Sequence, residues 1–196
     1  MDDIKSAREI AMEKVKRLGE VTDEERLRWK YVPEGERMAA EYLKEGGNLV
    51  TKLSQYKKNI AGYVIAGMSE TMVRNIDLPR DDLTKKNNRK AMDGLKTIKS
   101  DKVSVENVYS KLRRIFNHYL EQGEQQRKQA YEELRAEFEA KIQQALQQQL
   151  GTLWQGEIDV EKQPQFQEEW HRVEAQLDSQ YVTLLNEYKQ ELLAIP

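Results

Sequence analysis

The spacing of apolar residues in the C-terminal part of the chain constrains the fold more than any other feature. Between residues 131 and 153, and again between residues 166 and 195, an apolar residue recurs every 3 or 4 positions. This spacing places the apolar residues on one narrow face of an α-helix and does not fit the alternation of a strand. The two stripes are Tyr131, Leu134, Phe138, Ile142, Leu146, Leu150 and Leu153, then Phe166, Trp170, Val173, Leu177, Tyr181, Leu184, Tyr188, Leu192 and Ile195.

Two long helices with matching stripes and a short connection, here around Gly156 and Pro164, are predicted to fold back as an antiparallel hairpin. The mean intervals, about 3.67 residues in the first stripe and about 3.6 in the second, favour a nearly straight pair or weak right-handed coiling over a tight left-handed coil. From Tyr181 onward the second stripe widens, so we expect that end to pack on the N-terminal helices. The residues expected to form the hairpin seam are Phe138, Ile142, Leu146, Phe166, Trp170 and Leu177.

The first 120 residues are predicted to form a compact helical domain. Helices are expected at about 3–18, 22–32, 34–45 and 49–75, then from Asp81 or Asp82 to Ile98 and from Ser104 to Leu120. A break is expected before Pro33, because proline disfavours helical geometry in the preceding residue. The apolar segment 60–68 is ambiguous, since its β-branched residues also suit a buried strand. A helix is preferred there, and the expected fold is all-α without a sheet.

A domain joint is predicted near residue 121, giving domains 1–120 and 121–196. The segment Glu121 to Gln129 holds no apolar residue and contains Gly123. A helix that continued through this segment would make the C-terminal arm rigid, and a break would make it hinged. The sequence leaves both alternatives open.

Composition and motifs exclude several classes of protein. The 196 residues include no cysteine, which excludes disulfides, thiolate metal sites and a cysteine nucleophile. No apolar run reaches 18 residues, so no membrane span is expected. The start of the chain lacks the basic and apolar regions of a signal peptide, and we expect a cytoplasmic protein.

No cofactor or metal site is expected. The chain has no phosphate-binding glycine loop and no nucleophile elbow. Glu168 and His171 share a helix face, but half of the residues of a di-iron site are missing. His118 lies beside an apolar stripe and is interpreted as a boundary residue rather than a catalytic base. We therefore expect a non-enzymatic protein, with an enzyme of unrecognised type as a remaining alternative.

The charges are distributed unevenly. Residues 80–114 carry 11 basic and 5 acidic side chains, a balance of +6, whereas residues 115–196 carry 7 and 15, a balance of −8. The basic segment is interpreted as a solvated face, with nucleic acid or an acidic protein surface as alternative ligands. Its candidate binding residues are Lys85, Lys86, Arg89, Lys90, Lys96, Arg113 and Arg114.

The function that these patterns favour is protein–protein interaction. A hairpin with a narrow apolar seam and polar outer faces buries little surface by itself. We expect it either to bind a protein partner or to form a homodimer. A nucleic-acid-binding protein that uses segment 80–114 is the alternative.

Overall fold

The computed structural model describes residues 22–150 and 159–196, and in these ranges it contains helices and turns but no strand. The all-α prediction is confirmed, and segment 60–68 is helical. The helix expected at 3–18 and the connection around Gly156 lie outside the described residues. The elements are α2 (Asp23–Glu45), α3 (Leu49–Leu53), α4 (Lys58–Arg74), α5 (Asp82–Ile98), α6 (Lys102–His118), η1 (Tyr119–Gly123), α7 (Glu124–Leu150), η2 (Val160–Lys162) and α8 (Pro164–Ala194).

Helix α2 runs without interruption through Pro33, so the predicted break before this residue is wrong. The helix begins as expected: the Thr22 hydroxyl accepts a hydrogen bond from the Glu25 amide at 3.2 Å, and the Glu25 carboxylate accepts one from the Thr22 amide at 2.9 Å. An internal proline costs about 3 kcal/mol of helix stability. Contacts with another helix must therefore hold α2 together at this point.

Those contacts come from α4, which crosses α2 so closely that the backbones of the two helices are in contact. A Cβ atom built on Gly35 would lie 2.1 Å from the carbonyl oxygen of Val64, and one built on Gly67 would lie 2.0 Å from that of Val32. Only glycine fits at either position. This close approach, with the burial of Met38 on the next turn of α2, stabilises a continuous helix across Pro33.

The helix expected at 49–75 is divided in two by a turn between α3 and α4. Tyr56 lies in this turn and donates a hydrogen bond from its hydroxyl to Glu34 of α2 at 2.7 Å. Its ring also packs edge-on against Tyr31, with the ring centroids 6.3 Å apart. The turn therefore docks on α2, a long-range contact that local periodicity does not reveal.

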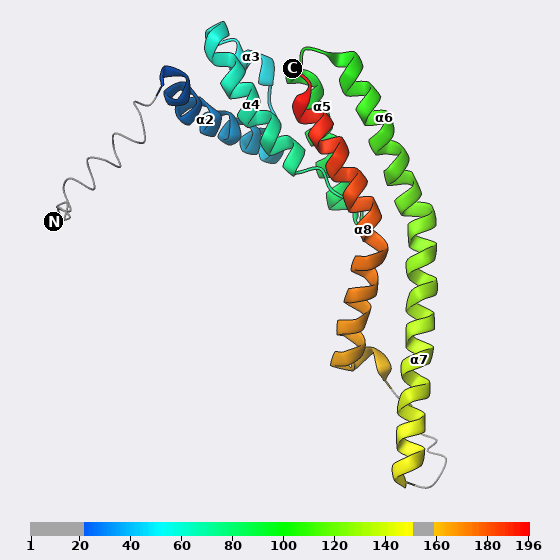
Figure 1. Cartoon of the computed structure of the whole chain (residues 1–196). Helices are drawn as coiled ribbons and strands as arrows, with labels where there is room; N and C mark the ends of the chain where they lie inside the picture. The colour runs from blue at the N-terminus through cyan, green and yellow to red at the C-terminus, as the bar shows by residue number, and fades with distance from the viewer. Residues whose placement is uncertain (1–21, 151–158) are drawn as a thin grey trace, which may run out of the picture.

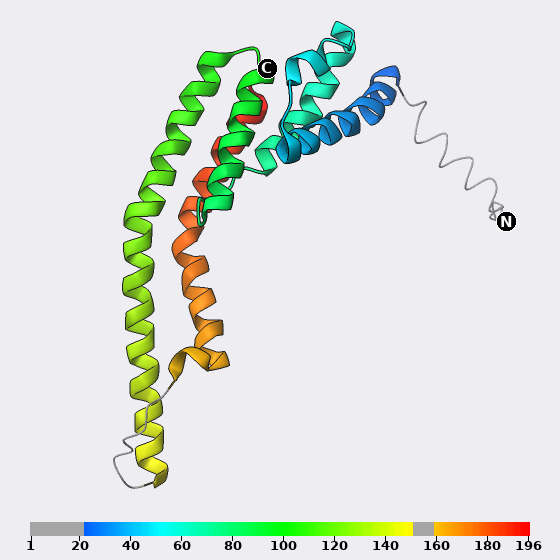
Figure 2. The ribbon, with the colours of Figure 1, turned by 180° about the vertical axis from the view of Figure 1, so that it is seen from behind.

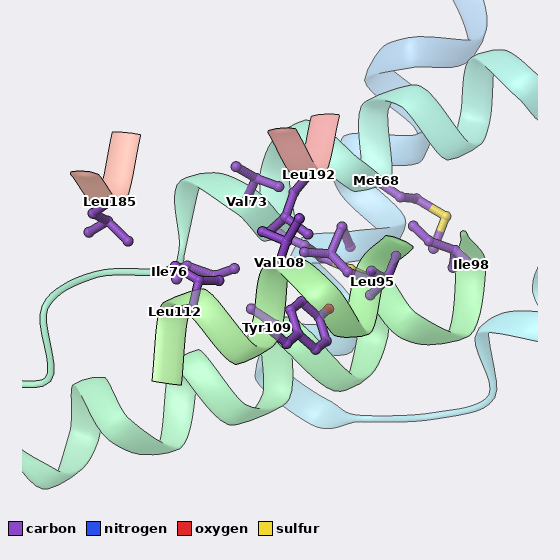
Figure 3. Close-up of a cluster of buried hydrophobic side chains, with 14 of the residues drawn as sticks. Met68, Val73, Ile76, Leu95, Ile98, Val108, Tyr109, Leu112, Leu185 and Leu192 are labelled. Atoms are coloured by element: carbon purple, nitrogen blue, oxygen red, sulfur yellow. The ribbon is translucent and has the colours of Figure 1, made fainter. Parts of the chain in front are cut away.

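The hydrophobic core is built mainly by α4, α5, α6 and the second half of α8 (Figure 3), and Met38 and Ala39 of α2 and Leu49 of α3 also belong to it. Met68 and Met72 of α4 and Leu112 of α6 are fully buried in it. Leu185 and Leu192 bring α8 into the same core. The wide end of the second apolar stripe therefore packs on the preceding helices, as its width predicts.

Helices α6, η1 and α7 form one continuous helical rod, and α8 runs beside it in the opposite direction (Figures 1 and 2). Element η1 is a π-helical turn that contains Gly123, so the chain stays helical at the predicted joint. Among the described residues, no helix has both the length and the apolar character that crossing a membrane requires.

We expect Gly67→Ala to lower the free energy of unfolding by about 3 kcal/mol, because the added methyl group forces α4 away from the α2 backbone. Urea unfolding followed by circular dichroism measures the change. Gly62→Ala on the same helix is the control, since a Cβ there meets no atom within 4 Å. This control should raise stability by about 0.5–1 kcal/mol. Equal effects of the two substitutions would contradict the proposed crossing.

Candidate functional site

A buried carboxylate joins three parts of the chain where α8 passes η1. Asp178 of α8 is 2% exposed. Its Oδ2 atom lies 2.8 Å from a guanidinium nitrogen of Arg80, and its Oδ1 atom lies 3.3 Å from one of Arg127. The Tyr119 hydroxyl donates a further hydrogen bond to Oδ2 at 3.3 Å. Two positive charges and a hydroxyl thus satisfy the buried negative charge.

The Arg80 side of this junction is fixed by the turn between α4 and α5. The buried side chain of Asn88 accepts a hydrogen bond from the Asp77 amide at 2.8 Å and donates one to the Asp77 carbonyl at 2.6 Å. Leu78 and Pro79 are buried beside it. The turn is therefore held in one conformation, which directs Arg80 toward α8.

On the η1 side, Gly123 makes room for the junction. A Cβ atom on Gly123 would lie 3.1 Å from a guanidinium nitrogen of Arg127 and 3.2 Å from the Tyr181 hydroxyl. The Arg127 guanidinium lies 4.1 Å from the centre of the Tyr119 ring, and Tyr181 packs edge-on against the same ring at 5.1 Å. The Tyr181 hydroxyl lies 2.9 Å from Nδ1 of His118. Burial raises the pKa of both phenols, so they remain protonated at neutral pH.

Sequence reasoning missed this junction, although a signal was present. Tyr119, Gly123 and Arg127 recur at intervals of four and share one helix face. Gly123 and Arg127 lie in the segment that lacks apolar residues, and Tyr119 lies just before it. A helix face that carries Arg127 can be buried only against a polar partner. That partner, Asp178, directly follows the predicted seam residue Leu177 and carries no distinguishing pattern of its own.

Beyond the junction, α7 and α8 meet through aromatic rings. Phe166 is buried, and its ring packs edge-on against Tyr131 and Phe138, with centroid distances of 5.5 Å to each. Trp170 packs edge-on against Tyr131 at 5.0 Å. The structure thus places Phe138, Phe166 and Trp170 in one cluster, and such pairs add about 0.5–1.5 kcal/mol each beyond the area that they bury.

Ile142 and Leu146 lie further along α7 and belong to an open apolar groove. Both side chains are half-buried. The groove has a volume of about 340 Å³. We call it the distal groove, and it is lined by Phe138, Lys141, Ile142, Ala145, Leu146, Gln163 and Gln165.

Leu177, the last predicted seam residue, lies elsewhere. It lines a larger groove of about 690 Å³ between α6 and α8, with Tyr181, Leu184 and Tyr188. The predicted basic residue Arg114 lines this groove as well. The six seam residues are therefore divided between the aromatic cluster, the distal groove and this α6–α8 groove.

The other candidate basic residues lie on and around a groove between α5 and α6. Lys85, Arg89, Lys96 and Arg113 line this α5–α6 groove, whose volume is about 330 Å³. Lys86 and Lys90 lie outside it, and the Lys90 amine is 5.8 Å from the centre of the Tyr42 ring. The sequence cluster is thus split between the groove and the neighbouring surface of α5.

In ranges 22–150 and 159–196, no three histidine, aspartate or glutamate side chains are arranged to hold a metal ion. Glu168 and His171 are both exposed on α8. The Asp178 junction is a buried cluster of titratable groups, in which the carboxylate is enclosed by its partners. The chemistry of this site is charge pairing that connects helices.

The fold and these sites define an all-α protein with a buried ionic junction and apolar and basic grooves. The chain belongs to DUF6657, a family of unknown function, whose match covers residues 50–194. The match includes α4 to α8, and with them the junction and all three grooves. Neither the curated proteins nor the solved structures give a significant match to this chain.

We expect Asp178→Asn to lower the free energy of unfolding by about 3 kcal/mol, because it leaves the largely buried guanidinium of Arg127 without its counter-charge. Glu169→Gln on the same helix removes an exposed ion pair with Arg172 and should cost less than about 0.5 kcal/mol. Urea unfolding of both variants gives the comparison. Similar small losses in the two variants would show that the junction contributes little to stability.

Proposed function

We propose that this protein is a non-enzymatic interaction protein. In this proposal α7 and the facing half of α8 form an antiparallel hairpin arm on a compact helical part, and two copies associate through the distal grooves of their arms. The observation that carries the proposal is the groove itself, in which Ile142 and Leu146 remain half-exposed at the far end of the rod.

The packing along the arm supports this function. Near the junction, the aromatic cluster fills the space between the two helices, so Phe166 is buried. Beyond Phe138, the groove is bordered from the α8 side by Gln163 and Gln165, which cover little apolar surface. A second apolar surface placed over Ile142 and Leu146 removes them from water, at about 25 cal/mol per Å² of apolar area buried.

The remainder of the arm surface is suited to solvent. Gln143, Gln144, Gln147 and Gln148 are exposed on α7. Arg135 pairs with Glu139, and Lys141 pairs with Glu137. In each ion pair the two residues are one helical turn apart. The apolar groove is therefore flanked by polar faces, an arrangement typical of an interface with an apolar centre and a polar rim.

The base of the arm supports the same function, since an interaction surface is more effective on a rigid element. The continuous α6–η1–α7 helix and the Asp178 junction both fix the direction of α7. Association of two identical grooves around a two-fold axis gives a closed dimer, which is the commonest symmetry of soluble oligomers.

We expect the wild-type protein to be a dimer at concentrations of tens of micromolar, and Ile142→Asp to be a monomer, because a carboxylate in the groove cannot be desolvated cheaply. Light scattering coupled to size-exclusion chromatography measures the mass. Gln143→Asp introduces the same charge one residue along, on the exposed face, and should remain dimeric with unchanged circular dichroism. A monomeric wild type, or a dimeric Ile142→Asp, would contradict self-association through this groove.

A further inference from the structure

The α5–α6 groove combines positive charge with an apolar floor. Lys85 and Arg89 lie one turn apart on α5 and border one part of the groove. Met92 of α5 and Phe116 of α6 line it as well, and both are half-buried. The hairpin arm does not use this surface, and the groove shares only Pro79 and Asn88 with the turn that leads to Arg80.

The positive charge is concentrated at the Lys85–Arg89 end. Lys96 and Arg113 both bind Glu106, at 2.9 and 2.8 Å. These hydrogen bonds hold the pKa of Glu106 below its ordinary value, so the carboxylate stays ionised and offsets part of their charge. Arg89, in contrast, forms no ion pair with any residue in the described ranges.

Lys85 is also available to a ligand. Its amine lies 3.0 Å from Asp82 on the same helix, but that carboxylate is 98% exposed. An exposed pair of this kind is worth less than about 1 kcal/mol and exchanges readily for another carboxylate. One end of the groove therefore offers two cations whose charge a partner could neutralise.

The size and walls of the groove suit a helix. Lys85 and Lys96 are separated by 11 residues of α5, or about 16 Å, which is three helical turns. The walls are two helices, and the groove between two packed helices accommodates the apolar face of a third. On the floor of the groove, the flexible side chain of methionine adapts to the shape of such a face. The phenylalanine ring provides a large apolar contact.

We propose that the α5–α6 groove binds an acidic amphipathic helix of a protein partner. Apolar side chains of that helix cover Met92 and Phe116, and its carboxylates pair with Lys85 and Arg89. Nucleic acid fits less well, because its phosphates can pair with Lys85 and Arg89 but leave the apolar floor of Met92 and Phe116 uncovered. This inference is independent of the distal groove and of self-association.

The experiment uses a fluorescein-labelled helical peptide of about 18 residues, with leucine on one face and glutamate on the other, titrated with the full chain. Fluorescence anisotropy is read at about 0.15 M salt, where long-range charge effects are screened. Two double variants are compared. The first carries both Lys85→Glu and Arg89→Glu, and the second carries both Lys86→Glu and Lys90→Glu. Both reverse two charges one turn apart on α5, but only the first pair lies in the groove.

We expect the wild type to bind the peptide and the Lys85→Glu, Arg89→Glu variant to bind it at least about tenfold more weakly, equivalent to about 1.4 kcal/mol. The Lys86→Glu, Lys90→Glu variant should bind within about threefold of wild type, which is about 0.7 kcal/mol. A peptide with its leucines replaced by glutamine should bind much more weakly, because it cannot cover the floor. Circular dichroism verifies folding, and Arg89→Gln replaces the first variant if it unfolds.

The proposal is overturned if the wild type does not bind the peptide, if both double variants weaken binding equally, or if the glutamine peptide binds as well as the leucine peptide. It is also overturned if a single-stranded oligonucleotide competes for the groove more tightly than the peptide. The Ile142→Asp variant should bind the peptide normally. A failure of dimerisation is thus distinguished from a failure of this groove.

Discussion

The burial of one carboxylate, that of Asp178, fixes where α8 meets two other segments of the chain. Its two oxygens pair with Arg80, from the turn before α5, and with Arg127, from the start of α7. A buried charge without partners costs several kcal/mol, so the three segments are stable only in register with one another. The π-helical turn and Gly123 provide the space in which this pairing occurs.

The polar junction also explains why the rod needs no apolar residue between Glu121 and Gln129. Above it, α6 and α8 share the hydrophobic core through Leu112, Leu185 and Leu192. Below it, aromatic rings hold α7 against α8. The junction lies at the boundary between these two apolar regions, where charge pairing takes the place of apolar packing.

Much of the local structure was predictable from the sequence. The helical periodicity of residues 131–150 and 166–192, the start of α2 after Thr22 and the packing of the late α8 stripe all follow from short-range patterns. The predictions failed at Pro33 and at the turn around Tyr56. In both places a contact with a distant residue, the α4 backbone or Glu34, outweighs the local preference.

The sequence by itself therefore determined the fold class, the helical stripes and the asymmetry of charge, because each depends on residues only a few positions apart. The tertiary structure decided which cations share a groove, which seam residues are covered, and that Arg80 and Arg127 meet at Asp178. The two ion pairs of Asp178, for example, join residues that are 51 and 98 positions apart. Which residues meet across such separations depends on how the helices cross. The crossing is fixed by the burial of apolar area and of charge, and only when the whole chain is packed.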